Sequence, residues 1–207
     1  TFCVISGVHY TQAIKVKRQR FVMTTNLIAP LKNANQIEQA KKFMADIIES
    51  PYNFDLQWID RNKHIVIPVE GGVRYVEAEW FSRALTTIGL TECLAIATED
   101  IAPVAPECYK LRVSQDSFLE IDKTFFGVNY ILLSLDGKFA ILLTSENYFL
   151  VAGSKTFVEQ AIGCSIATGR KMFWSFISDP TWPKDIQDRL IAVYQRYEKT
   201  DYFASLS

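Results

Sequence analysis

The stretch VNYILLSLDGKFAILLTSENYFLVA, residues 128–152, determines the predicted fold more than any other part of the chain. It holds three runs rich in β-branched, aromatic and aliphatic residues, separated by polar turns: 128–135, 138–144 and 148–152. Asp136-Gly137 is the strongest hairpin signal in the sequence, because both central residues of this tight turn need a positive φ. The stretch therefore predicts a three-strand antiparallel meander.

Helices flank this meander on both sides. Before it, residues 108–113 are typical of a strand, and Ser117 with Glu120 predicts a short helix over 118–125. After it, Ser154 predicts the N-cap of a helix that ends at Gly163. Two further helices are expected. The first begins at Thr168, buries Met172 and Phe173 and stops at Pro180, and the second covers about 184–198.

The same kinds of element are predicted in the N-terminal half. Residues 2–10 and 19–28 are typical of strands, and Asn35 with Glu38 begins an amphipathic helix that reaches Pro51. A second meander is expected next, with strands at 55–60, 63–69 and 73–77. Pro68 cannot donate a hydrogen bond to a neighbouring strand, which places it at an edge or a bulge. A helix from Ala78 closed by Gly89 and a strand at 92–98 complete the half.

The two halves have the same order of elements. Gly89 and Gly163 are 74 positions apart, and Phe81 and Phe157 are 76 positions apart. The order predicts an α+β protein of antiparallel β-meanders packed with helices, in which a βαβββα unit is either duplicated or arises twice by chance. The expected halves are 1–98 and 107–207, joined by the proline-containing segment 99–106 within one two-lobed domain.

Composition excludes several functional classes. The chain is 49% hydrophobic with a formal net charge of −1, which gives no overall field for nucleic acid or an anionic membrane. No apolar run is long enough to span a bilayer, and residues 1–10 do not have the order of a signal peptide, so a cytoplasmic protein is expected. Four separated cysteines and two histidines offer no local metal-ligand spacing, so we expect neither a metal nor a cofactor.

The candidate catalytic groups are weak. Cys3 and His9 would point to opposite faces of a strand, and His64 in a meander strand favours a structural role. Two pairs of carboxylates two positions apart would share a face if the backbone were extended, and could then act as acid and base: Glu77 with Glu79, and Glu120 with Asp122. Solvated charge at the ends of elements is the alternative interpretation of both pairs.

Other residues favour a surface for a protein partner. Residues 1–50 carry an excess of positive charge and residues 51–104 an excess of negative charge. Beyond the last helix, aromatic residues are candidate interface anchors. The predicted partner-binding residues are Glu77, Glu79, Glu99, Asp100, Tyr202 and Phe203. We expect reversal of Glu99 and Asp100 to Lys to weaken a complex with a basic partner and to leave folding nearly unchanged.

The stretch Leu135–Ile162, a hairpin that leads into a helix, resembles small bacterial proteins, some of which are similar to immunity proteins of toxin systems. The order helix, meander, helix also resembles secretion-chaperone-like domains. Both resemblances imply binding of a protein partner without catalysis. The sequence thus predicts a non-catalytic protein-binding protein of immunity-like character. The alternatives are a hydrolase that uses paired carboxylates and a domain that binds a small molecule.

Overall fold

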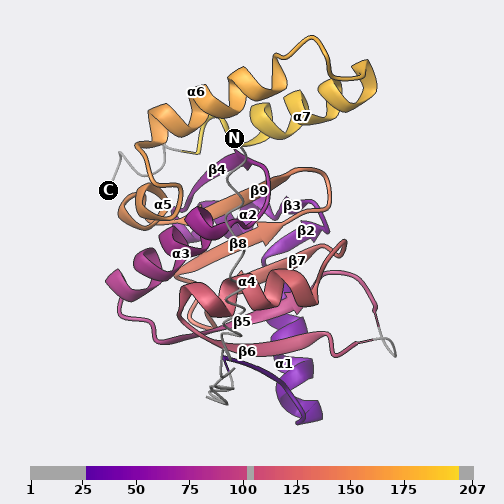
Figure 1. The fold of residues 1–207 in the computed structure, drawn as a ribbon, viewed down its shortest axis with the longest axis vertical. Helices are drawn as coiled ribbons and strands as arrows, with labels where there is room; N and C mark the ends of the chain where they lie inside the picture. Colours follow the sequence, from indigo (N-terminus) through magenta and orange to yellow (C-terminus); the bar gives the residue numbers. More distant parts are fainter. Residues whose placement is uncertain (1–26, 102–104, 201–207) are drawn as a thin grey trace, which may run out of the picture.

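A computed structural model describes residues 27–101 and 105–200. Its centre is a seven-stranded antiparallel sheet with the strand order β1-β6-β5-β7-β8-β9-β4 (Figure 1). The strands are β1 (Ile28–Pro30), β4 (Ile65–Glu70), β5 (Glu92–Ala97), β6 (Cys108–Arg112), β7 (Tyr130–Leu133), β8 (Phe139–Leu143) and β9 (Tyr148–Gly153). A small two-stranded sheet pairs β2 (Ile48–Ser50) with β3 (Asn53–Phe54). The α+β class expected from the sequence is confirmed.

The predicted meander forms the middle of the sheet. Every residue of β7, β8 and β9 is buried, because helices cover both faces of these strands. Alternate residues point to opposite faces, so that Ile141 packs with one group of helices while Leu142 packs with the other. The continuous apolar runs of the sequence follow directly from burial on both sides.

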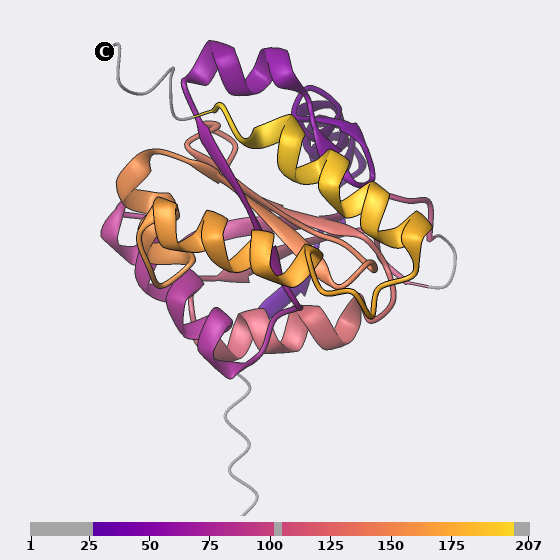
Figure 2. The same cartoon turned by 90° about the horizontal axis from the view of Figure 1, so that it is seen from above.

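The helices lie in two layers (Figure 2). One layer consists of α3 (Tyr75–Thr87), α4 (Gln115–Thr124) and α5 (Lys155–Ala161). The other side carries α1 (Ala34–Ala45), α2 (Leu56–Asn62) and α7 (Lys184–Tyr197). Helix α6 (Ile166–Ile177) packs along the outer strand β4 and contributes residues to both cores. The sheet is therefore shielded on both faces and along one edge.

Side-chain caps explain where most of these helices begin. Asn33, Asp55, Ser114, Ser154 and Ser165 each accept a hydrogen bond from a backbone N–H of the first helical turn, which would otherwise lack a partner. The Ser154 cap confirms the sequence prediction. Three starts lie two or three positions earlier than expected: the cap is Asn33 rather than Asn35, Ser114 rather than Ser117, and α6 begins at Ile166 rather than at Thr168.

The predicted strand at 55–60 is wrong, because these residues form α2. Phe54, Leu56 and Trp58 alternate with polar residues, which is the pattern of a half-buried strand. The Asp55 carboxylate instead accepts the N–H of Trp58 at 2.7 Å and starts a helix that buries Trp58 and Ile59. A local cap and tertiary burial therefore outweigh the alternation.

The predicted strand at 73–77 is also wrong, since α3 begins at Tyr75. The backbone N–H of Arg74 donates to the Glu77 carboxylate at 3.0 Å, and this bond stabilises the first turn. Of the three strands expected at 55–77, only β4 is present. The N-terminal half therefore lacks the meander on which the predicted duplication rested, and the structure does not show an internal duplication.

The hairpin between β7 and β8 is confirmed, but its turn differs from the expected one. Only Gly137 has a positive φ, of 71°, and its N–H donates to the Ser134 carbonyl at 3.0 Å. The connection spans residues 134–138, so it is longer than a two-residue turn. Met172, expected to be buried, is 52% exposed. Pro68 lies in β4 at the edge of the sheet, as predicted.

The predicted strand at 2–10 and most of the one at 19–28 lie outside the described residues. Strands from both halves of the chain belong to the same sheet, where β5 and β6 are neighbours across the segment 99–106. Within residues 27–101 and 105–200, no helix is both long and apolar enough to cross a membrane.

Candidate functional site

One end of the sheet gathers several connecting segments. The strand β4 ends at Glu70, which pairs with Tyr148 at the start of β9, and β8 ends at Leu143 opposite Tyr130 of β7. The loops after β4, before β7 and between β8 and β9 therefore meet at this end. We call it the α4 end, because helix α4 ends beside these loops.

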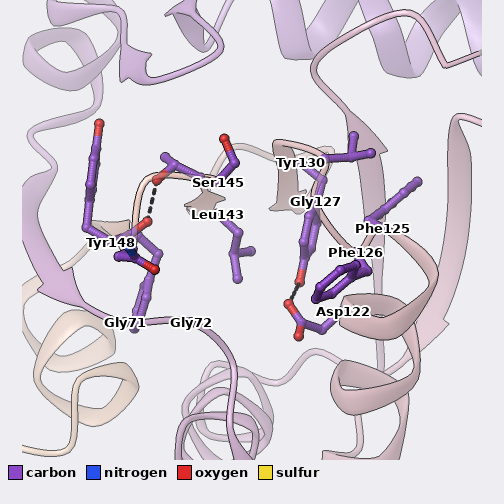
Figure 3. Close-up of a pocket in the computed structure, with 14 residues that line it drawn as sticks. Gly71, Gly72, Asp122, Phe125, Phe126, Gly127, Tyr130, Leu143, Ser145 and Tyr148 are labelled. Atoms are coloured by element: carbon purple, nitrogen blue, oxygen red, sulfur yellow. Dashed lines mark hydrogen bonds between the residues drawn. The ribbon is translucent and has the colours of Figure 1, made fainter.

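A pocket of about 320 Å³ lies between these loops (Figure 3). Asp122 and Tyr130 stand on one side of it, and Gly71, Gly72 and Tyr148 on the other. Of the residues that the structure describes, Asp122 is the only charged one that lines it. The lining residues are Gly71, Gly72, Asp122, Phe125, Phe126, Gly127, Val128, Tyr130, Leu143, Thr144, Ser145, Asn147, Tyr148 and Phe149.

The Asp122 carboxylate is fixed by the hydroxyl of Tyr130, which donates to Oδ1 at 2.9 Å. Burial raises the pKa of Asp122 above its ordinary value, and the hydrogen bond from Tyr130 opposes this only in part. Burial, together with the Asp122 charge, raises the pKa of Tyr130 well above its ordinary value. Tyr130 therefore stays protonated and acts as a hydrogen-bond donor to the carboxylate.

Phe126 stands at the rim of this pocket with 89% of its side chain exposed. Its neighbour Phe125 is buried and packs against the Tyr130 ring, with centroids 5.1 Å apart. Burial of Phe125, the C-cap of α4, leaves the following residue, Phe126, in solvent. Of the large apolar side chains that the structure describes as exposed, Phe126 has the highest exposure.

Glu77 and Glu99, both predicted partner-binding residues, lie at the α4 end, but each is engaged within the fold. Glu77 is buried and binds the Arg74 guanidinium at 2.6 Å. Burial alone would raise the pKa of Glu77, but the bonds from Arg74 outweigh burial and lower it. Glu99 accepts a hydrogen bond of 2.5 Å from Nδ2 of the buried Asn129.

Asn129 explains why Glu99 matters for the fold. Its Oδ1 accepts the N–H of Ser145 at 2.6 Å, and its carbonyl accepts the N–H of Thr98 at 2.9 Å. Glu99 thus completes a network that joins three connecting segments. The structure alters the expectation that Glu99 can be changed to Lys without loss of folding stability. A lysine at this position would leave the buried amide of Asn129 without its acceptor.

The remaining predicted partner-binding residues are scattered. Glu79 is exposed on α3, and Asp100 is exposed just after β5. The pKa of Lys41 is raised mainly by its hydrogen bond to Glu107 and more weakly by the charge of Asp100. Tyr202 and Phe203 lie outside the described residues.

The predicted carboxylate pairs do not assemble. Glu77 and Glu79 belong to α3, and Glu120 and Asp122 belong to α4, where positions two apart lie on different sides of the helix. The extended backbone that would align them is absent from both places. In the described part of the chain, no group of three or more His, Cys, Asp and Glu side chains is placed to hold a metal ion.

Cys93, Cys108 and His64 are buried. Burial raises the pKa of Cys93 to about 12 and that of Cys108 to about 11, so both thiols stay protonated. His64 is buried, packs edge-on against Trp58 and binds the Gly137 carbonyl through Nε2 at 2.8 Å. Burial lowers the pKa of His64.

Two further hollows of about 380 Å³ each differ from the α4-end pocket in their charges. One lies beside α7, where Arg189 binds Glu146 at 2.7 Å and Arg196 binds Glu49. The other lies at the opposite end of the sheet and contains an ion pair between Lys110 and Glu92. The charged groups that form these ion pairs are already neutralised.

The sequence analysis singled out Asp122 but missed Phe126. The available signal is the pair Phe125-Phe126 before Gly127. Successive residues at the end of a helix point in different directions, so burial of the first side chain turns the second away from the core. The link between Asp122 and Tyr130 could not be found from spacing, because it depends on where the fold places the end of α4 relative to the first residue of β7.

Comparison with known proteins identifies no relative: no family, no curated protein and no solved structure matches this chain.

Proposed function

We propose that this protein acts by binding another protein through its α4 end, with Phe126 as the central anchor. The supporting observation is a phenylalanine with 89% exposure at the rim of a pocket. A single exposed apolar residue needs no explanation, but large aromatic side chains that meet a partner beside a pocket often contribute most of the binding free energy.

The charge around the pocket favours a basic partner. The segments that surround it, 70–77, 120–130 and 143–149, contain five carboxylates and two basic residues. Two of the carboxylates have cationic partners, since Glu77 binds Arg74 and Glu146 binds Arg189. The other charged residues of these segments are three carboxylates, Glu70, Glu120 and Asp122, and one base, Lys123. Such an excess of negative charge speeds the approach of a positively charged protein and orients it. A toxin neutralised by an immunity-like protein would be one such partner.

Catalysis by this site lacks a second reacting group. Asp122 has Tyr130 as its hydrogen-bond donor, and Tyr130 is held in its protonated form. Within residues 27–101 and 105–200, no other charged residue lines the pocket. An acid and base pair of the kind predicted from the sequence would need two carboxylates of different pKa within one site.

The test compares the wild type with Phe126→Ala in capturing proteins from a lysate of the source cells, followed by equilibrium binding of each purified candidate. Because hot-spot aromatics contribute about 2 kcal/mol or more, the variant is expected to weaken the complex roughly 30-fold. Leu135→Ala is the matched control, since Leu135 is 62% exposed in the loop at the opposite end of the sheet. It should bind like the wild type.

Charge is tested with Glu70→Lys, which reverses an exposed carboxylate next to the lining residue Gly71. The expected result is a slower association whose rate depends less on salt. Asp60→Lys makes the same change near the other end of the sheet and should have little effect. A partner that binds Phe126→Ala as tightly as the wild type would refute this surface.

A further inference from the structure

Among the described residues, the Asp122 carboxylate is the one charged group that lines its pocket, and it has no cationic partner there. Among the ion pairs that the described residues form, none involves Asp122. Its interaction in the pocket is the hydrogen bond from the neutral hydroxyl of Tyr130. Asp122 is half-buried, and even partial burial of a charge without a counter-ion costs free energy, in the direction of its raised pKa.

The walls of the pocket are suited to an amphipathic guest. Phe125, Leu143 and Phe149 supply apolar surface, while the hydroxyl residues Thr144 and Ser145 border the same space. A volume of about 320 Å³ lies at the lower end of the range for ligand pockets, roughly 300 to 1,000 Å³. It suits one long side chain better than a large cofactor.

Lysine and arginine have the matching chemistry. Their methylene stems pack on apolar walls while the charged head reaches a carboxylate. Phe126 at the rim lies where the backbone of an approaching partner would contact it. The carboxylate, the stem-sized walls and the rim anchor thus belong to one surface.

We infer that the Asp122 pocket receives a lysine or arginine side chain of the partner protein, whose cationic head binds the Asp122 carboxylate held by Tyr130. This inference rests on the proposed function and specifies how the partner is recognised. The two other hollows do not offer this recognition, because their ion-paired charged groups already have partners within the chain.

The experiment titrates the full chain with Nα-acetyl-lysine methylamide and follows backbone amide signals by NMR. We expect shifts at the pocket residues Gly71, Gly72 and Gly127 and a dissociation constant on the order of 1 mM, as befits a fragment of this size. The norleucine analogue has the same stem without the charge. It should bind at least about tenfold more weakly, because it cannot form the charge-assisted hydrogen bond.

Asp122→Asn should weaken the lysine probe about tenfold or more, because the amide retains the shape of the carboxylate but not its charge. The matched control is Asp116→Asn, which removes an exposed carboxylate in the first turn of the same helix. It should leave probe binding unchanged. Equal binding of the lysine and norleucine probes, or undiminished binding to Asp122→Asn, would overturn the inference.

The two proposals fail in distinguishable ways, since the probe needs no partner. If a partner depends on Phe126 while the lysine probe does not bind the pocket, the inference fails and the proposed function stands. If a free diamine such as cadaverine binds more tightly than the lysine probe, the pocket serves a small amine, and the inference is overturned. Loss of partner binding in both Phe126→Ala and Asp122→Asn supports the two together.

Discussion

Gly163→Ala should destabilise the protein more than Gly89→Ala, although both glycines follow the C-cap residue of a helix and both have a positive φ. The values are +68° for Gly163 and +78° for Gly89, so an alanine costs roughly 1 to 2 kcal/mol at either place. A methyl group at Gly163 would also lie 2.5 Å from Cζ2 and 2.7 Å from Cδ2 of Trp80, whereas nothing lies within 4 Å at Gly89.

Normal carbon contacts are about 3.5 to 4.0 Å, so the Trp80 ring must move, at a further cost of roughly 1 to 3 kcal/mol. The expected loss is therefore about 1 to 2 kcal/mol for Gly89→Ala and about 2 to 5 kcal/mol for Gly163→Ala. Urea unfolding measures both, with the slope of the transition checked for constancy. Truncation of Trp80 should remove the extra cost in a double-mutant cycle. Equal losses, or no coupling to Trp80, would refute the packing of α5 against α3 at this point.

Three other predictions concern burial and charge. Leu85→Ala and Phe157→Ala should each cost on the order of 2 to 5 kcal/mol in unfolding free energy, because both side chains are fully buried; near-neutral effects would contradict their placement. The lowered pKa of His64 means that the unfolded chain binds a proton below about pH 6.5 while the folded chain does not. Unfolding free energy should therefore fall as pH decreases below 6.5, and less steeply in His64→Gln. The raised pKa of Asp122 means that its charged form destabilises the folded chain. Asp122→Asn should therefore stabilise the protein at pH 7, and this gain should vanish below about pH 3.9, where the unfolded carboxyl is also protonated. Acid titrations of the variants against the wild type measure both effects.

The sequence predicted the C-terminal half well because its signals are local and mutually consistent. The runs of β7, β8 and β9 are apolar throughout, and polar turns separate them. Ser154 caps the following helix as expected. In this region the period, the turn residues and the cap all indicate the same structure.

The N-terminal half was predicted less well because two local signals conflict there. Around Trp58 the alternation of apolar residues indicates a strand, while Asp55 can cap a helix. Around Glu77, the β-branched Val73 and Val76 favour a strand, and Arg74 is not a usual capping residue. In both places the helix forms because its buried side chains complete a core that the sequence pattern does not reveal.

The site was the part least accessible from sequence, for a physical reason. A carboxylate becomes distinctive when burial, a hydrogen-bond donor and the lack of a counter-ion coincide, and these depend on elements far apart in space rather than on spacing in the chain. For Asp122 the donor comes from β7 and the opposite wall from the loop after β4. An asparagine would keep an acceptor for the buried Tyr130 hydroxyl without the charge, and so would cost less stability at this position. A cationic side chain that binds the carboxylate would offset this cost in the complex. The stabilisation expected for Asp122→Asn and the loss of lysine binding expected for the same variant are therefore two consequences of one uncompensated charge.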